Sequence, residues 1–225
     1  MSTPASRPVA GITDRIAQLY RRELLLAGQR FRADEVDENF VGTPNLAVDT
    51  SVQRVDRQIA VENAASRYRA YASLVLPHRF QTADYARHIG AEIPSRPFAH
   101  LQENKEWEKA LPLLLLDRYF LSRPIGDHQV MAGQLVFLLS LIEESQAEVR
   151  VVDGWMNDTV IELQLDHELL VTEGNGLTIY RADRFQVPVH TYDLCLTIDK
   201  ALSKEESHRL LTDAHDHHAR EAARS

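Results

Sequence analysis

Three histidines near the C-terminus form the one histidine cluster in this chain. His215 and His218 are three positions apart, so on a helix they share one face. Imidazole is a common zinc ligand, but zinc usually needs three or four fixed ligands held by second-shell partners. Because this cluster lies at a chain end with no cysteine beside it, we treat His215 and His218 as weak metal candidates and expect no cofactor.

Carboxylates are concentrated between residues 127 and 182. This segment contains ten acidic residues and only two arginines, so its net charge of −8 equals that of the whole chain. Nucleic-acid binding depends on Lys and Arg side chains that neutralise phosphates, and an acidic surface repels a phosphate backbone. We therefore expect the segment to contact a protein partner or a second copy of the chain. The candidate docking residues are Asp158, Glu162, Asp166, Glu168 and Glu173.

Positive charge lies earlier in the chain, in a basic region at 61–109 and on the expected helix at 51–76, which overlaps the start of that region. Aromatic residues are interspersed among these bases, a pattern that suits weak contact with nucleic acid but is also typical of a solvated helix surface. We expect direct nucleic-acid binding to be weak or indirect. The possible nucleic-acid or dimer face consists of Arg54, Arg57, Arg67 and Arg69.

The common catalytic motifs are missing from the sequence. It contains no G-x-S-x-G elbow, no P-loop and no H-E-x-x-H. Gly174-Asn175-Gly176 resembles the start of a dinucleotide loop, but no glycine follows at the required spacing. We therefore assign no catalytic residue, and an enzyme of unrecognised type remains an alternative.

The chain has the features of a cytoplasmic protein without membrane contact. No apolar run approaches the roughly 20 residues needed to span a bilayer, and the N-terminal sequence has no apolar core of a signal peptide. The single cysteine, Cys195, excludes an internal disulfide and lies in an apolar run typical of a buried thiol.

Apolar residues at helical spacing predict a largely helical chain. The segment 128–145 is apolar almost all round, so we expect it to be the buried central helix. The last helix begins at Ser203, where Glu206 completes a capping box. Other helices are expected at 13–27, 51–76, 82–90 and 100–123, a loop at 29–50, and one more strand within 187–199. The chain then divides into a flexible leader (1–12), a helical region (13–126), an acidic unit (127–200) and a C-terminal helix with its tail (201–225).

The acidic unit admits two interpretations. In the first, residues 157–166 form a helix, and a hairpin that turns at Gly174-Asn175-Gly176 completes a winged-helix-like unit. In the second, Ile161, Leu163 and Leu165 alternate with polar residues as in a strand, and 147–198 forms an antiparallel β-meander. A cap signal at Asn157 and Asp158 favours the helix, whereas the β-branched run "TVI" favours the strand. We favour the winged helix.

The predicted fold class is α+β and mostly helical, with a helical N-terminal half followed by this unit. In layout it resembles the small winged-helix (kite) subunits of condensin-like complexes, which implies a non-catalytic interaction subunit of a DNA-handling assembly. The alternative is a winged-helix transcriptional regulator that contacts DNA through the basic region at 61–109.

Overall fold

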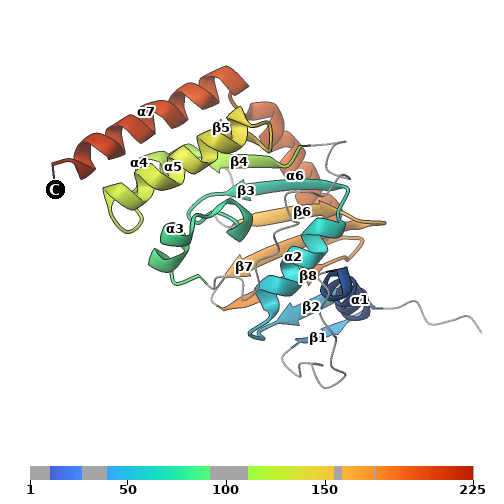
Figure 1. Cartoon of the computed structure of the whole chain (residues 1–225). Helices are drawn as coiled ribbons and strands as arrows, with labels where there is room; N and C mark the ends of the chain where they lie inside the picture. Colours follow the sequence, from blue (N-terminus) through green and yellow to red (C-terminus); the bar gives the residue numbers. More distant parts are fainter. Residues whose placement is uncertain (1–10, 27–39, 92–110, 155–158, 175, 225) are drawn as a thin grey trace, which may run out of the picture.

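One mixed β-sheet organises the molecule. The computed structural model describes residues 11–26, 40–91, 111–154, 159–174 and 176–224. Within these residues, eight strands are ordered β1-β2-β8-β7-β6-β3-β4-β5 across the sheet (Figure 1). The neighbours β3, β4 and β5 run parallel, and the other neighbouring pairs are antiparallel. The strands are β1 (Phe40–Thr43), β2 (Leu46–Asp49), β3 (Arg67–Ala72), β4 (Leu113–Asp117), β5 (Glu148–Val152), β6 (Val160–Gln164), β7 (Glu168–Gly174) and β8 (Leu177–Arg181).

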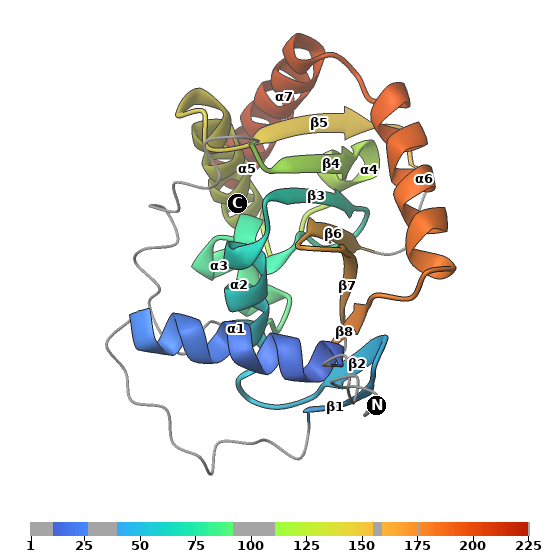
Figure 2. The ribbon, with the colours of Figure 1, turned by 90° about the vertical axis from the view of Figure 1, so that its right-hand side faces the viewer.

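Helices cover both faces of the sheet. Figure 2 shows α6 alone on one face, while α2, α5 and α7 lie on the other. Of the described residues, 50% are helical and 23% lie in strands, so the protein has a mixed α/β fold in which helix exceeds strand. The helical elements of the described part are α1 (Ile12–Leu26), α2 (Arg54–Ala64), the 3-10 turn η1 (His78–Phe80), α3 (Ala83–His88), α4 (Arg118–Ser122), α5 (His128–Glu143), α6 (Gln186–Lys200) and α7 (Lys204–Ala222).

The main core lies between the sheet and the α5/α7 layer. Alternate side chains of a strand point to opposite faces, so each strand contributes every second residue to this core. The central strands supply Tyr68, Leu114 and Ile161, and the helices supply Leu135 and Leu211, all buried. A smaller cluster on the opposite face joins the sheet to α6 and consists of Tyr71, Leu115, Val152 and Leu194.

The helix expected at 157–166 was wrong, and the winged-helix interpretation that needs it is not confirmed. Val160–Gln164 form β6, which pairs antiparallel with β3 and β7. Ile161 and Leu163 lie in the main core. The alternation of apolar and polar residues, and not the cap signal at Asn157 and Asp158, therefore predicted this segment correctly. The alternative meander is correct for β6, β7 and β8 only. β5 lies at the far edge beside β4, and the chain after β8 is helical.

Four further expectations, the helices at 51–76 and 100–123, the loop at 29–50 and the strand at 187–199, were wrong. The helix expected at 51–76 ends at Ala64 and is followed by β3, and the apolar run at 113–117 is β4. β4 is an inner strand with parallel neighbours on both sides and helices over both faces, where a continuous apolar run replaces alternation. β3 does alternate, but Arg67 and Arg69 on its α6 face pair with Glu162 and do not face solvent as in a half-exposed strand. The loop expected at 29–50 contains the β1–β2 hairpin. The strand expected at 187–199 lies in α6, whose first turn accommodates Pro188 because that turn needs no donated hydrogen bond.

Other predictions were confirmed. The central apolar helix is α5, with the Asp127 carboxylate accepting from the Val130 amide. The β7–β8 hairpin forms as expected, and Gly176 has a positive φ of 76°. α7 begins at Ser203 with its capping box to Glu206.

The sheet combines strands from both the 13–126 and the 127–200 segments. In the described part of the chain, no helix is long and apolar enough to cross a membrane.

Candidate functional site

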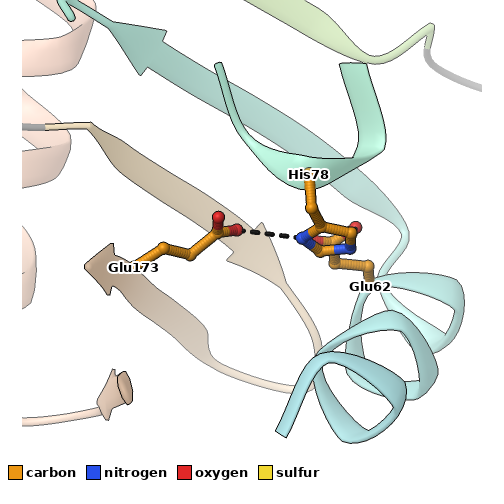
Figure 3. Close-up of side chains that lie close together, drawn as sticks. All are labelled: Glu62, His78 and Glu173. Carbon is orange, nitrogen blue, oxygen red and sulfur yellow. Dashed lines mark hydrogen bonds and ion pairs between the residues drawn. The ribbon is translucent and has the colours of Figure 1, made fainter. Parts of the chain in front are cut away.

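Glu62, His78 and Glu173 form a buried polar cluster on the α2 side of the sheet. Glu62 lies in α2, His78 begins η1, and Glu173 is near the end of β7. Figure 3 shows the imidazole ring of His78 next to both carboxylates. One potential ligand atom from each residue lies within 4.8 Å of the other two. Three segments that are distant in sequence therefore bring a nitrogen and two carboxylates together.

Hydrogen bonds fix the position of two of these side chains. His78 Nδ1 is 3.0 Å from Glu173 Oε1. The other ring nitrogen, Nε2, is 3.8 Å from Glu62 Oε2, which is beyond hydrogen-bond range. The Glu62 side chain is 1% exposed and that of His78 is 10% exposed, so water has little access to this contact.

Two neighbours hold the carboxylates in place. The amide nitrogen of Gln58 donates to Glu62 Oε1 at 3.1 Å and also to Glu173 Oε1. Thr178 donates its hydroxyl hydrogen to Gln58 Oε1 at 3.2 Å, which orients that amide. Arg79 Nη1 lies 3.5 Å from Glu62 Oε2. Two carboxylates thus face one guanidinium and one imidazole.

The cluster shifts the pKa values of its members. Burial raises the pKa of the Glu62 carboxyl, against the opposing attraction of His78 and Arg79. Burial alone would lower the pKa of His78, but Glu62 and Glu173 outweigh it and raise that pKa to about 9. Burial also works against ionised Glu173, yet His78 and the hydrogen bonds lower its pKa. At neutral pH, in the absence of any ligand, His78 is therefore a cation beside an ionised Glu173.

Several predicted site residues lie in a different ion network, under α6. Glu162 was expected to be an exposed docking residue, and that was wrong: it is buried on the α6 face of the sheet. Arg69 binds the Glu162 carboxylate in a bidentate manner, with Nε–Oε2 and Nη2–Oε1 distances of 2.9 and 2.7 Å. Arg67 Nη2 is 2.9 Å from Glu162 Oε1. Two arginines of the proposed nucleic-acid face, Arg67 and Arg69, are thus paired with a buried carboxylate.

The remaining arginine and acidic candidates are dispersed. Arg57 is buried and bonds Asp49 through Nε at 2.7 Å, so it is a core ion pair and not an exposed face. Arg54 begins α2 and is half-buried. Asp166 is exposed and pairs with Arg15, and Glu168 lies 3.6 Å from Arg67. Asp158, like residues 92–109 of the basic region and 1–10 of the leader, lies outside the described residues.

The two histidines considered as metal ligands have different environments. His218 is buried, with Nε2 3.1 Å from the Leu121 carbonyl and Nδ1 2.9 Å from His128 Nδ1. Burial lowers the pKa of His218, and His128 and His217 lower it further. His215 pairs instead with the adjacent Asp216 at 3.1 Å. The structure therefore does not bring His215 and His218 together on one ligand.

The outer face of α6 is apolar and exposed. Phe185, Val189 and Tyr192 are 72%, 59% and 63% exposed. The opposite side of the helix, with Val187 and Leu194, packs against the sheet. The Asp183 carboxylate accepts hydrogen bonds from the Phe185 and Gln186 amides and so fixes the start of this helix.

Sequence reasoning missed both of these features. His78 lies outside the one histidine cluster that the sequence shows, and no local motif connects it to a glutamate 95 residues away. The α6 stripe was missed because the segment was read as a strand. Its 4-and-3 spacing of large apolar residues was the signal that could have revealed it.

Comparisons with known proteins give a family but no activity. No curated protein matches the chain. One similar solved structure is TrmBL2, described as an archaeal chromatin protein with a novel mode of DNA binding, at 11% identity and a TM-score of 0.40. The match covers 84% of this chain and 62% of that one, and at this TM-score it supports no conclusion about fold or DNA binding. Residues 55–213, well over half of the chain, match the family described as "Domain of unknown function (DUF5753)". The chain therefore belongs to the DUF5753 family.

Proposed function

We propose that this protein is a non-catalytic interaction module that pairs with a second copy of itself through the outer face of α6. One observation carries the proposal: Val189 and Tyr192 on one side of α6, and Phe185 at its N-cap, are all strongly exposed, whereas the other side of the helix is buried. Scattered exposed apolar residues are ordinary, but a contiguous apolar stripe favours a binding surface.

The spacing of the stripe suits a partner helix. Phe185, Val189, Tyr192 and the half-buried Leu196 are separated by four, three and four residues. This alternation keeps side chains on the seam between two helices that pack as a coiled coil. The stripe extends over most of α6, long enough for about two heptads.

Charge at the two ends of the stripe favours a second copy in antiparallel orientation. Arg184 is exposed just before α6, and Asp199 is exposed near the end of the helix, beside the exposed Lys200. An antiparallel pair sets Arg184 of each copy near Asp199 of the other, whereas a parallel pair sets like charges side by side. A two-fold arrangement also repeats each contact, so one complementary end pair counts twice.

In this proposal the outer face of α6 is the main docking site, in place of the acidic residues that the sequence suggested. Glu162 and Glu173 are engaged in internal networks, which leaves Asp166 and Glu168 as proposed secondary contacts for a basic partner. Membership of a larger cytoplasmic, DNA-associated assembly remains a wider hypothesis. Direct DNA contact through Arg67 and Arg69 gains no support, because both pair with Glu162.

Mass measurement in solution tests the proposal. We expect the full chain to sediment as a dimer at micromolar concentration, and the double variant Val189→Asp/Tyr192→Asp to sediment as a monomer with an unchanged circular dichroism spectrum. The matched control is Val136→Asp, which changes an exposed apolar residue on α5 and leaves the dimer intact. A monomeric wild-type protein across the micromolar range contradicts the proposal without reference to any variant.

A further inference from the structure

Two buried atoms of the Glu62–His78–Glu173 cluster face each other without a hydrogen-bond partner. These atoms are His78 Nε2 and Glu62 Oε2, and they lie 3.8 Å apart. A normal N–H···O bond joins atoms about 2.7–3.2 Å apart, so a shared proton does not bridge this gap well. Buried polar atoms are nearly always satisfied, yet among the described residues Glu62 Oε2 has only the 3.5 Å ion pair with Arg79 Nη1 and His78 Nε2 has no hydrogen bond, so the arrangement needs an explanation.

The gap between the two atoms has the width of a bound cation. Zinc binds nitrogen and carboxylate oxygen at about 2.0–2.2 Å, so two of its ligand atoms can be separated by up to roughly 4 Å. The separation of 3.8 Å falls within that limit. Imidazole combined with carboxylate is a donor set that suits divalent transition metals.

The third member of the cluster occupies the usual position of a second-shell group. In metal sites, a ligating histidine almost always donates its other ring N–H to a carboxylate or carbonyl. His78 Nδ1 contacts Glu173 Oε1 at 3.0 Å, which places the proton on Nδ1 and a lone pair on Nε2 once the ring is neutral. Gln58 holds Glu173 and also the second oxygen of Glu62.

We propose that Glu62, His78 and Glu173 form a binding site for one divalent transition-metal ion, for which zinc serves as the probe. His78 Nε2 and Glu62 Oε2 are the two direct protein ligands, one fewer than a zinc site usually has, Glu173 orients the imidazole, and water fills the remaining positions. The site is independent of the α6 surface, because it lies on the opposite side of the sheet.

Metal competes at this site with a proton and with Arg79. The guanidinium lies 3.5 Å from Glu62 Oε2 and partly neutralises the carboxylate when no metal is bound. His78 must be neutral before Nε2 can bind metal, because a protonated ring nitrogen has no lone pair to offer.

Zinc titration of tag-free protein tests the site. The background is His215→Ala/His217→Ala, which removes exposed or half-buried tail imidazoles that could bind zinc adventitiously. We expect this background to bind one zinc ion, as measured by competition with a chelator. Glu173→Gln should weaken binding by about 10–100-fold, as loss of a second-shell group does, and Glu62→Gln and His78→Gln should weaken it more.

Two outcomes overturn the proposal. One is equal zinc stoichiometry and affinity in the background protein and in its folded His78→Gln variant, which would assign the metal to other residues. The other requires no variant: X-ray absorption of the zinc-loaded background protein should show one imidazole and oxygen donors, and several imidazoles would overturn the assignment.

Discussion

His78 Nδ1 lies 3.0 Å from Glu173 Oε1, a contact that joins η1 to β7 across 95 residues of sequence. Glu62, Glu173 and Arg79 all face the imidazole, and the two carboxylates outweigh both burial and the guanidinium. The same ring therefore stabilises the fold as a cation and, in the proposed metal site, acts as a neutral ligand.

The protonation of His78 makes stability fall as pH rises. Its pKa is 6.5 in the unfolded chain and about 9 in the folded protein. The stabilisation is thus complete below pH 6.5 and is lost as pH rises towards 9, a total of at most about 3 kcal/mol. Urea unfolding across this range, with metal chelated, should show the decline in the wild type and in His167→Gln, which changes an exposed histidine. His78→Gln should flatten it. A wild-type profile that rises through this window contradicts the assignment.

The Glu162 network stabilises the junction between the sheet and α6. Glu162→Ala leaves Arg69 without its partner in a mostly buried position, and we expect a loss of roughly 3 kcal/mol in the free energy of unfolding. The control Asp166→Ala breaks an exposed arginine pair and should cost less than about 1 kcal/mol. Equal effects of the two substitutions would show that burial does not strengthen the Glu162 pairs.

The N-terminus of α7 depends on the capping box of Ser203 and Glu206. Ser203 Oγ accepts from the Glu206 amide at 3.1 Å, so Ser203→Ala should reduce stability by about 1 kcal/mol. Ser203→Asp retains an oxygen at the cap and should restore most of the loss. Thermal unfolding measures both, and an Ala variant as stable as the wild type would mean that packing of α7 on α5 alone fixes this end.

The charges at the ends of the α6 stripe should control dimer affinity. Arg184→Glu places glutamate opposite Asp199 of the second copy and should weaken the dimer, more strongly at low salt because such contacts are screened. The double variant Arg184→Glu/Asp199→Arg exchanges the charges and should restore association. Sedimentation equilibrium checks both variants. Failure of the exchange to restore a dimer, with Arg184→Glu still weakened, excludes the antiparallel orientation.

Local signals predicted some elements well. The capping box, the apolar α5 and the glycine turn of the β7–β8 hairpin depend on residues close in sequence, and each was correct. β4 was misread because it is covered on both faces, so its apolar residues do not alternate. β3 was misread because Tyr68 and Tyr71 also fit helical spacing, although its side chains alternate between the two faces. α6 was misread because "VPVHTYDLCLTID" also has a strand-like pattern, and only packing on the sheet selects the helix.

The candidate site depends entirely on contacts between distant segments. Glu62, His78 and Glu173 have no motif spacing, and their shifted pKa values arise from burial that only the folded sheet provides. Charge counting also overestimated the acidic surface. It treated Glu162 as solvent-exposed, whereas two arginines from β3 neutralise it beneath α6.

Disulfide trapping at the middle of the α6 stripe tests the central claim most directly. Tyr192 is the midpoint between Phe185 and Asp199, so an antiparallel pair brings it close to its own counterpart, and a disulfide forms only when the two Cα atoms are within about 7 Å. In a Cys195→Ser background, Tyr192→Cys should give a covalent dimer on mild oxidation, whereas Val136→Cys on α5 should not. Equal trapping at both positions, or none at Tyr192→Cys, would contradict pairing through α6.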